Sequence, residues 1–576
     1  MYSDDSTVRM SLRMLAVFLV LGGALLSPAA AGEDSGLRQS FARPPDSAAP
    51  YTWWHWINGN ITRRGITRDL EAMKQAGLEG ATLFNTGQLP HGPVQVLSDE
   101  WYSMVEHAAE EADRLGLKLG FHNCPGWATA GGPWIEKRHA MRMLTWETVS
   151  VDGPRELSRS LPQPQTHLDL YRDVAVLAFP ALDWTREQPR MAPRKTVTPG
   201  NIDAEAGTIA RSDIVNLTEK LDDDGTLQWR VPEGNWTIMR IGATVLKRRN
   251  SPAPDEATGL ECNKMSAEAV KDHFNGMVGK ILDRVGDLAG DSVTHVLVDS
   301  WGRHPWVGWQ NWTPGFRQKF EARRGYAPLR YLPVLTGRAV ESPDVSKRFL
   351  WDMRRTIGDS IEENFFGTLR RLCHRHDVQL AFEPYYDGHN VSTPYSNVAA
   401  GERADVPMAE FWVNRGKEHR ARMGASSAHT TGKTVVGAEA FTGGRAWKNH
   451  PYSLKPLGDR MYCADINRFY LHTYVHQPYE RLKPGLTLGP YGTHFGRNVT
   501  WWGHADAWMS YMTRCQYMLQ QGRTVADICY LAPTGVNVKQ PPGGRQLKLT
   551  PSVPPGYDYD QVSRRVLLAG GAGVLG

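Results

Sequence analysis

The chain has 576 residues, which is more than one ordinary hydrophobic core requires, so we expect two or three domains with one large barrel among them. Its 66 Lys and Arg stand against 61 Asp and Glu, a formal net charge of +5, and no long basic run gathers that charge, so nucleic acid is not an expected partner. The 20 Trp and 20 Tyr favour a carbohydrate partner, because flat aromatic faces stack on sugar rings, although the same residues also fill large cores.

The amino terminus has the pattern of an export signal in residues 1–31. Two arginines precede an apolar stretch over residues 15–26, and three alanines at positions 29–31 supply small residues for cleavage. The apolar stretch is shorter than the roughly 20 residues of a membrane span. We therefore expect an exported protein, periplasmic or extracellular, with no stable membrane span after signal cleavage, and a retained anchor is the alternative. Residues 32–50 are rich in Pro, Ser and Ala and are predicted as a linker.

From residue 51 on, short apolar runs alternate with amphipathic helical patterns, which indicates parallel β/α construction. Between residues 66 and 77, Ile66, Leu70 and Met73 share one helical face, and Gly77 ends the helix. The fold class is therefore predicted as α/β, a (β/α)8 barrel with an insertion. The other predicted elements of the barrel are helices over residues 100–116 and 266–285, and strands over residues 80–85, 117–123, 294–299, 378–383, 406–411 and 434–441.

The barrel is predicted in two parts, residues 51–141 and residues 251–521. Between them, residues 142–250 show strand patterns punctuated by Pro and Gly, which favours an inserted β-sandwich. A strand over residues 526–531 begins a further α/β segment, for which residues 522–576 leave too little room. We therefore expect the start of a C-terminal α/β domain, in a chain that stops early relative to a complete protein.

Four acidic residues lie at or near the carboxyl ends of predicted strands, namely Asp299, Glu383, Glu410 and Glu439. In a parallel barrel the active site lies at this end, because the βα loops converge there. Glycoside hydrolysis needs such a set, with one carboxylic acid to protonate the leaving oxygen and one carboxylate to activate water or attack the sugar. Any single acid could instead form a salt bridge or a helix cap.

Aromatic and polar residues accompany these acids along the chain. Apolar walls raise the pKa of a carboxyl group, whereas hydrogen-bonding neighbours keep a second carboxylate ionised. Together with Asp299 and Glu383, the residues that we expect to bind substrate are Trp54, His55, Asn58, His122, Asn123, Trp127, Tyr385, Trp412 and His494.

Patterns for other chemistry are weak or absent. The sequence has no HExxH pattern and no CxxC pair, and the spacing of His472 and His476 suits one helical face but is more typical of isolated structural histidines. Calcium held by oxygen ligands is compatible with the sequence, because such a site leaves no readable spacing. No phosphate loop, dinucleotide fingerprint or GxSxG elbow is present, so phosphoryl transfer, hydride transfer and serine hydrolysis are not supported.

Seven segments carry a family resemblance: WWHWINGNIT (53–62), HNCPGWATAGGPWI (122–135), GLECNKMS (259–266), QNWTPGFRQKFEARRGY (310–326), ADVPMAEFW (404–412), VVGAEAFT (435–442) and GPYGTHFGRNVTWW (489–502). In this order they resemble glycoside hydrolase family 106, the inverting α-L-rhamnosidases. The resemblance spans about residues 51–531. It implies a catalytic barrel with an inserted β-sandwich, release of terminal α-L-rhamnosyl residues from glycans or glycosides, dependence on calcium, and Glu410 and Glu439 as the acids of the active centre.

One position departs from the expected family pattern. The family leads us to expect an acid shortly after the Asp-Ser-aromatic run of the fourth strand, where this chain has Gly302. Either Asp299, Glu383 or Glu410 then donates the proton, or the chain is a weak or inactive relative. Our working assignment is Glu439 as general base with Glu410 as its partner. The alternatives are a carbohydrate-binding protein without activity, and a retaining glycosidase or a polysaccharide lyase on the same barrel.

Overall fold

The computed structural model describes residues 33–182, 202–301, 310–385, 395–414, 418–443, 446–532, 549 and 551–570. The predicted signal, residues 1–31, lies outside the described residues. The chain divides into a first unit that ends at Arg43 and a second unit from Pro44 to Gly576. The predicted linker is not wholly irregular, since it contains helix α1 (Glu33–Ala42) and a short 3-10 turn over Asp46–Ala48. Among the described residues, no helix combines the length and the apolar character that crossing a membrane requires.

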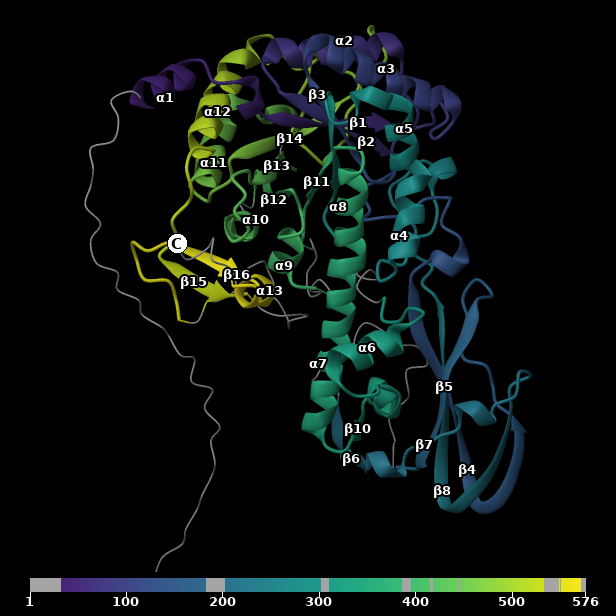
Figure 1. The fold of residues 1–576 in the computed structure, drawn as a ribbon. Coiled ribbons are helices and arrows are strands. Elements are labelled where there is room, and N and C mark those ends of the chain that lie inside the picture. The colour runs from purple at the N-terminus through teal and green to yellow at the C-terminus, as the bar shows by residue number, and fades with distance from the viewer. Residues whose placement is uncertain are drawn as a thin grey trace, which may run out of the picture. The chain divides into compact units, whose positions relative to one another are not determined.

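The second unit contains a closed barrel of eight parallel strands, in the order β1-β14-β13-β12-β11-β9-β3-β2 (Figure 1). This confirms the predicted fold class. The strands are β1 (Tyr51–Ile57), β2 (Gly80–Thr86), β3 (Lys118–His122), β9 (Val293–Val298), β11 (Gln379–Phe382), β12 (Val406–Trp412), β13 (Gly437–Thr442) and β14 (Arg468–Val475).

Strand β14 corrects the helical interpretation of His472 and His476. The run RFYLHTYV is rich in aromatic and β-branched residues, which favour a pleated strand. His472 lies within this strand and His476 lies just beyond its end. The four-residue spacing therefore does not place the two rings on one helical face.

The helices alternate with the barrel strands, and two of them show why the sequence folds as predicted. Helix α2 (Arg63–Ala76) begins where the Thr62 side chain accepts from the backbone of Gly65, and it ends at Gly77, whose φ of 86° suits glycine. Helix α3 (Asp99–Leu115) begins at Ser98 in the same way. The other helices of the barrel are α4 (Ala267–Phe274), α5 (Lys280–Val285), α6 (Phe316–Arg324), α7 (Pro343–Ile361), α8 (Gly367–His374), α9 (Asn397–Gly401), α10 (Glu418–His429), α11 (Pro451–Tyr462) and α12 (Ala505–Leu519).

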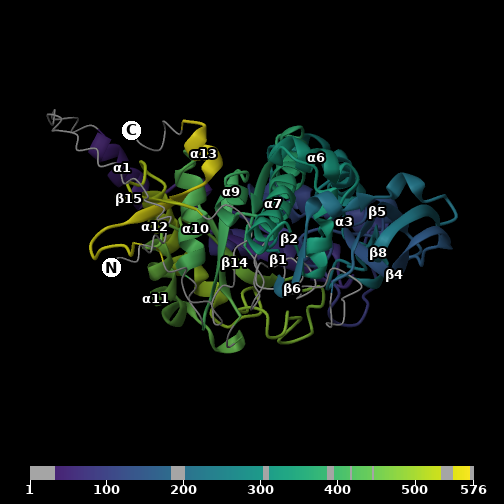
Figure 2. The same cartoon turned by 90° about the horizontal axis from the view of Figure 1, so that it is seen from below.

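The inserted segment forms one antiparallel sheet in its described residues. Its strand order is β4-β8-β5-β7, with β4 at Arg142–Ser160, β5 at Tyr171–Pro180, β7 at Val215–Asn216 and β8 at Thr226–Val245. Figure 2 shows β4, β5 and β8 grouped as a sheet. Strand β6 (Asp203–Ile209) pairs instead with β10 (Arg338–Val340), outside this sheet. The described residues therefore show a single four-stranded sheet in place of the two facing sheets of the predicted sandwich, and residues 183–201 lie outside the description.

The sheet of the insertion is buried on both faces by different partners. Leu157, Leu227 and Trp229 belong to a small cluster within the insertion. Phe179 and Ile241 belong to the main core of the unit, which also contains the helices of the barrel. The alternation of side chains along β5 and β8 thus attaches the insertion to the barrel through one face of the sheet.

The predicted strand over residues 526–531 is β15 (Ile528–Leu531), which pairs in parallel with β16 (Tyr559–Val562). Helix α13 (Arg564–Leu568) follows. Polar contacts hold this pair against α10, since the Asp560 carboxylate accepts from the Ser426 hydroxyl at 3.0 Å and lies 3.1 Å from the ring of His429.

Candidate active site

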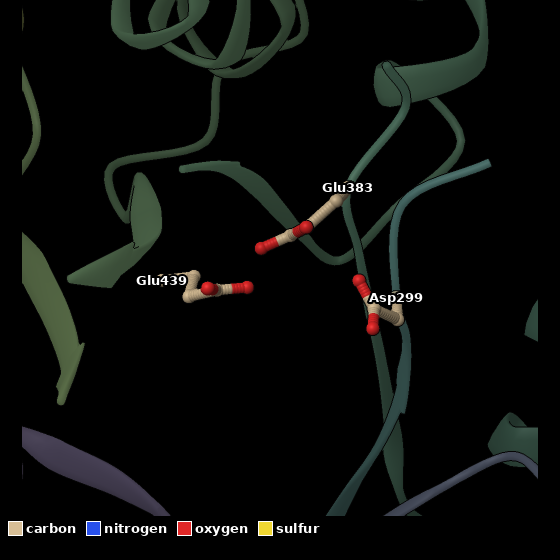
Figure 3. A group of neighbouring side chains, drawn as sticks. All are labelled: Asp299, Glu383 and Glu439. Carbon is tan, nitrogen blue, oxygen red and sulfur yellow. The ribbon is translucent and has the colours of Figure 1, made fainter. Parts of the chain in front are cut away.

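Four acids from four consecutive strands of the barrel lie at one end of it. Asp299 follows β9, Glu383 follows β11, and Glu410 and Glu439 lie opposite each other in the pairing of β12 with β13. Figure 3 shows Asp299, Glu383 and Glu439 projecting into a common space, and these three offer oxygens that all lie within 4.8 Å of one another. All four side chains are buried. The folded chain thus gathers acids that are up to 140 positions apart in the sequence.

Glu383 has few hydrogen-bond donors for a buried acid. The Tyr385 hydroxyl donates to its Oε2 at 2.5 Å, whereas no donor reaches Oε1 among the residues that the structure describes. Burial raises the pKa of the Glu383 carboxyl well above its usual range, and the neighbouring Glu439, Asp299 and Glu410 raise it further. This environment favours a protonated carboxyl at neutral pH.

Asp299 has a related but less extreme environment. Burial raises the pKa of its carboxyl to about 8, and the nearby Glu410 adds to this, while a hydrogen bond from the backbone N–H of Ser300 acts in the opposite direction. Asp299 and Glu383 interact electrostatically, so the two carboxyl groups titrate as a coupled pair.

Glu410 differs from both, because it is paired with a cation. Arg420 on α10 forms a salt bridge to its Oε2, and the indole N–H of Trp412 donates to its Oε1. The guanidinium of Arg420 also lies over the Tyr385 ring, 4.2 Å from its centroid. Both oxygens of Glu410 are thus acceptors, which suits a carboxylate that stays charged more than one that delivers a proton.

Glu439 accepts a hydrogen bond from the Thr442 hydroxyl, and the Nδ1 atom of His472 lies 3.7 Å from its Oε1. Burial lowers the pKa of His472 to about 3, so the ring is neutral. A carboxylate with a hydroxyl donor and a neutral ring beside it has the properties of a general base.

A layer of neutral histidines lies below the acids. Burial lowers the pKa of His122 to about 4 and places the pKa of His55 well below its usual value. His122 donates from Nδ1 to the Cys124 carbonyl at 2.6 Å and accepts at Nε2 from the backbone N–H of Asp299 at 3.3 Å. Phe84 stacks on His122, with ring centroids 4.5 Å apart. Two predicted residues, His55 and His122, thus support the floor of the site.

Trp54 does not belong to the site, which corrects our expectation. Successive side chains of a strand point to opposite faces, and Trp53 and His55 take the inward positions of β1. Trp54 instead packs in the layer between the barrel and α2, where its indole N–H donates to Asp69 at 3.3 Å. Its side chain is fully buried there.

The remaining predicted residues lie around the mouth of the barrel. Asn58 donates to the Leu89 carbonyl, and Asn123 donates to the Thr129 carbonyl, so both amides brace loops. Trp127 is half-buried, and its ring contacts that of Tyr491 at a centroid distance of 5.5 Å. His494 contacts Trp447 at 4.4 Å. No substrate contact follows from these positions alone.

Three residues of the site were not among the site residues that the sequence predicted. Arg420 comes from the first turn of α10, Thr442 from the end of β13 and His472 from a strand that was not predicted. The signal that could have found Arg420 is its position ten residues after Glu410, one strand-to-helix crossing away. Gly302 lies outside the described residues, as do residues 386–394, 415–417 and 444–445, which follow the other three acids.

Comparisons with known proteins agree with this geometry. A family model described as alpha-L-rhamnosidase, that of glycoside hydrolase family 106, matches residues 42–190 and 190–570. The chain belongs to this family. The family assignment confirms the resemblance that the sequence shows.

Two examples illustrate which individual proteins are similar to the chain. The solved structure of a rhamnosidase from Novosphingobium sp. PP1Y superimposes with a TM-score of 0.82 at 26% identity, over 92% of this chain and 64% of that one. A protein of Formosa agariphila named "Putative beta-glucuronidase" is 41% identical over 565 residues, which are 95% of this chain and 47% of that protein. The chain thus spans about half the length of the curated relative that it matches.

Proposed function

We propose that this chain carries the catalytic barrel of an exported glycoside hydrolase that removes terminal α-L-rhamnosyl residues with inversion. The observation that carries the proposal is the set of four buried acids from β9, β11, β12 and β13 at the carboxyl end of the barrel. Membership in the α-L-rhamnosidase family supports the choice of sugar.

The environments of the acids suggest a division of roles. Glu439, beside a hydroxyl donor and a neutral ring, activates the attacking water as general base. Glu383 has the properties of the proton donor, because burial and its neighbours keep its proton on at neutral pH. An oxygen of Glu383 lies within 4.8 Å of one of Glu439, which is closer than the roughly 6.5–9.5 Å of an inverting pair, so the proposal of inversion rests on the family resemblance and not on this distance. Glu410, paired with Arg420, remains charged and stabilises the positive charge that develops on the sugar ring. This changes our working assignment, in which Glu410 was the partner of Glu439.

We also propose that the acids of the site bind a calcium ion when they are ionised. Asp299, Glu383 and Glu439 fit the ion because they offer three buried carboxylate oxygens that lie close together, one of them a Glu383 oxygen that no donor reaches among the described residues. A bound calcium ion would supply positive charge and would hold oxygen ligands. The three carboxylates would hold it only when deprotonated, so calcium and the proton on Glu383 compete.

The competition between calcium and the proton on Glu383 can be measured, and it tests whether these acids bind a metal ion or take part in proton transfer. Calcium affinity, measured by titration calorimetry between pH 5 and pH 9, is expected to rise with pH, because the pKa of Asp299 is about 8. If a chelator leaves turnover unchanged at pH 6, Glu383 keeps its role as donor. Loss of turnover on chelation would instead assign the three acids to a required metal site.

The function itself is tested with the purified chain and an aryl α-L-rhamnoside, with the product anomer followed by proton NMR. We expect release of the sugar with inverted configuration. Retained configuration would indicate a covalent nucleophile, and absence of turnover would favour a carbohydrate-binding protein without activity. An aryl β-D-glucuronide is assayed in parallel, because the name of the Formosa relative favours that substrate as the second candidate.

Export is tested by expression with residues 1–31 present. The pattern at positions 29–31 predicts a mature amino terminus at Gly32, which amino-terminal sequencing of the secreted protein would detect. An uncleaved, membrane-associated product would contradict the proposal.

A further inference from the structure

A second hollow lies away from the acids, between α3 and α5. It has a volume of about 310 Å³, which is at the lower end of the range for small-ligand sites. It is lined by the segment before α3, by α3 itself, by Pro133 and Trp134 after β3, and by Glu256, Gly276 and Lys280. None of the four acids of the candidate active site lines it.

Three polar groups at this hollow have no partner among the described residues. The hydroxyl of Tyr102 makes no hydrogen bond there, although only 5% of the residue is exposed. The side-chain amide of Gln95 and the ammonium of Lys280 are exposed and likewise unpaired in this part of the chain. Only Tyr102 is buried among the three residues, and the two exposed groups contact water in the free protein. All three groups are available to a ligand that carries hydroxyl or carboxylate groups.

Close packing holds the two aromatic rings of the hollow in place. Trp134 lies against Gly132 and Gly276, where a Cβ atom would approach its ring to 2.4 Å and 2.2 Å respectively. Arg284 lies 4.9 Å from the centroid of the Tyr102 ring and pairs with acids of α3. Residues other than glycine at positions 132 and 276 would therefore displace Trp134.

The backbone segment before α3 is also held in place. Glu256 accepts at Oε1 from the backbone N–H of Val96 at 2.8 Å. The next residue, Leu97, has a φ of 71°, a left-handed conformation that costs free energy in a residue with a branched side chain.

We propose that this hollow, defined by Gln95, Tyr102, Trp134, Glu256 and Lys280, binds one pyranose unit of a glycan outside the catalytic site. Aromatic walls with a few hydroxyl, amide and charged groups are the combination that recognises a sugar ring. The ammonium of Lys280 adds affinity for a uronate unit over a neutral sugar. The inference rests on the proposal that the substrate is a carbohydrate, but it does not depend on turnover.

The test is calorimetric binding of L-rhamnose and of D-glucuronate to the full chain. The double variant with Tyr102→Phe and Lys280→Ala is expected to lose one binding site per chain, or to weaken it at least tenfold. The single variant Lys280→Ala is expected to weaken D-glucuronate binding more than L-rhamnose binding. Tyr557→Phe and Lys271→Ala are matched controls at exposed positions elsewhere.

Each outcome decides the inference. Binding isotherms that are identical for wild type and the double variant overturn it, as does the absence of binding of either sugar. Hydrolysis of an aryl α-L-rhamnoside is expected to be unchanged in the double variant. If no variant or wild type hydrolyses that substrate but one site still disappears in the double variant, the proposed hydrolase activity fails while the second sugar site stands.

Discussion

Two buried acids in the same barrel have opposite surroundings. Asp69 on α2 is fully buried outside the strands and accepts from the ring of His476 at 2.8 Å, from the guanidinium of Arg497 at 2.8 Å and from the backbone of Gln477 at 3.1 Å. Glu383 is 2% exposed inside the barrel mouth, with one donor and three other acids around it. The first is satisfied and ties α2 to the end of β14. The second is left short of donors, which is the pattern expected of a group that reacts.

The largest effect on activity is expected at Glu439, the proposed general base, which lies beside Glu383. Glu439→Gln is expected to lower kcat on an aryl α-L-rhamnoside by about 1,000-fold, because the amide cannot accept the proton of the attacking water. Sugar binding by calorimetry is expected to survive. Turnover within a factor of two of wild type would remove Glu439 from the mechanism.

Glu383→Gln separates activity from stability. The variant is expected to lose about 100-fold or more in kcat, because the proton donor is gone. Its thermal unfolding midpoint at neutral pH is expected to be close to that of wild type, because a neutral amide replaces a carboxyl group that is already protonated. A lower midpoint would mean that Glu383 is structural, as Asp69 is.

Asp69→Asn tests the other side of the comparison. Loss of the buried charge leaves the guanidinium of Arg497 without its carboxylate partner, so the free energy of unfolding is expected to fall by about 3 kcal/mol. The activity per folded molecule should change little. Urea unfolding measures the first quantity and an active-site titration the second, and a stable but inactive variant would contradict the structural role.

Stability should also depend on pH through Asp299. Its pKa is about 8 in the folded chain and about 3.9 when unfolded, so the folded state binds more protons between these values. The contribution of Asp299 to the free energy of unfolding therefore falls as pH rises from about 4 to about 8. Urea unfolding at pH 5 and pH 8 should show Asp299→Asn gaining stability relative to wild type at the higher pH. A pH-independent difference would show that Asp299 is not protonated in the folded protein.

The smallest effect is expected at Trp54. Trp54→Phe removes a hydrogen bond to the Asp69 carboxylate and leaves a cavity in the core, so it should lower the free energy of unfolding by about 2 kcal/mol. The KM for an aryl α-L-rhamnoside should not change, because the ring lies outside the barrel. A raised KM with unchanged stability would restore Trp54 to the substrate site.

The sequence predicted the features that follow from local pattern. Helix α2 was predicted from the spacing of its apolar residues and from Gly77. The four acids were expected to lie together because each follows or ends a predicted strand, and parallel strands end at the same side of a barrel. The sequence did not predict β14, because polar residues interrupt RFYLHTYV without a clear alternation. Nor could it orient Trp54, since the face of a strand is fixed only by its register in the barrel. His472 reaches the acids through that same register, whereas Arg420 reaches them through the packing of α10 against β12.

The most direct measurement of the central claim is the protonation state of Glu383. The infrared spectrum of the folded chain at pH 6, without calcium, is compared with that of Glu383→Gln. We expect wild type to show a protonated-carboxyl band that the variant lacks, because burial and the neighbouring carboxylates hold that proton. Identical spectra would show that Glu383 is ionised at pH 6, and the proposed proton donor would be wrong.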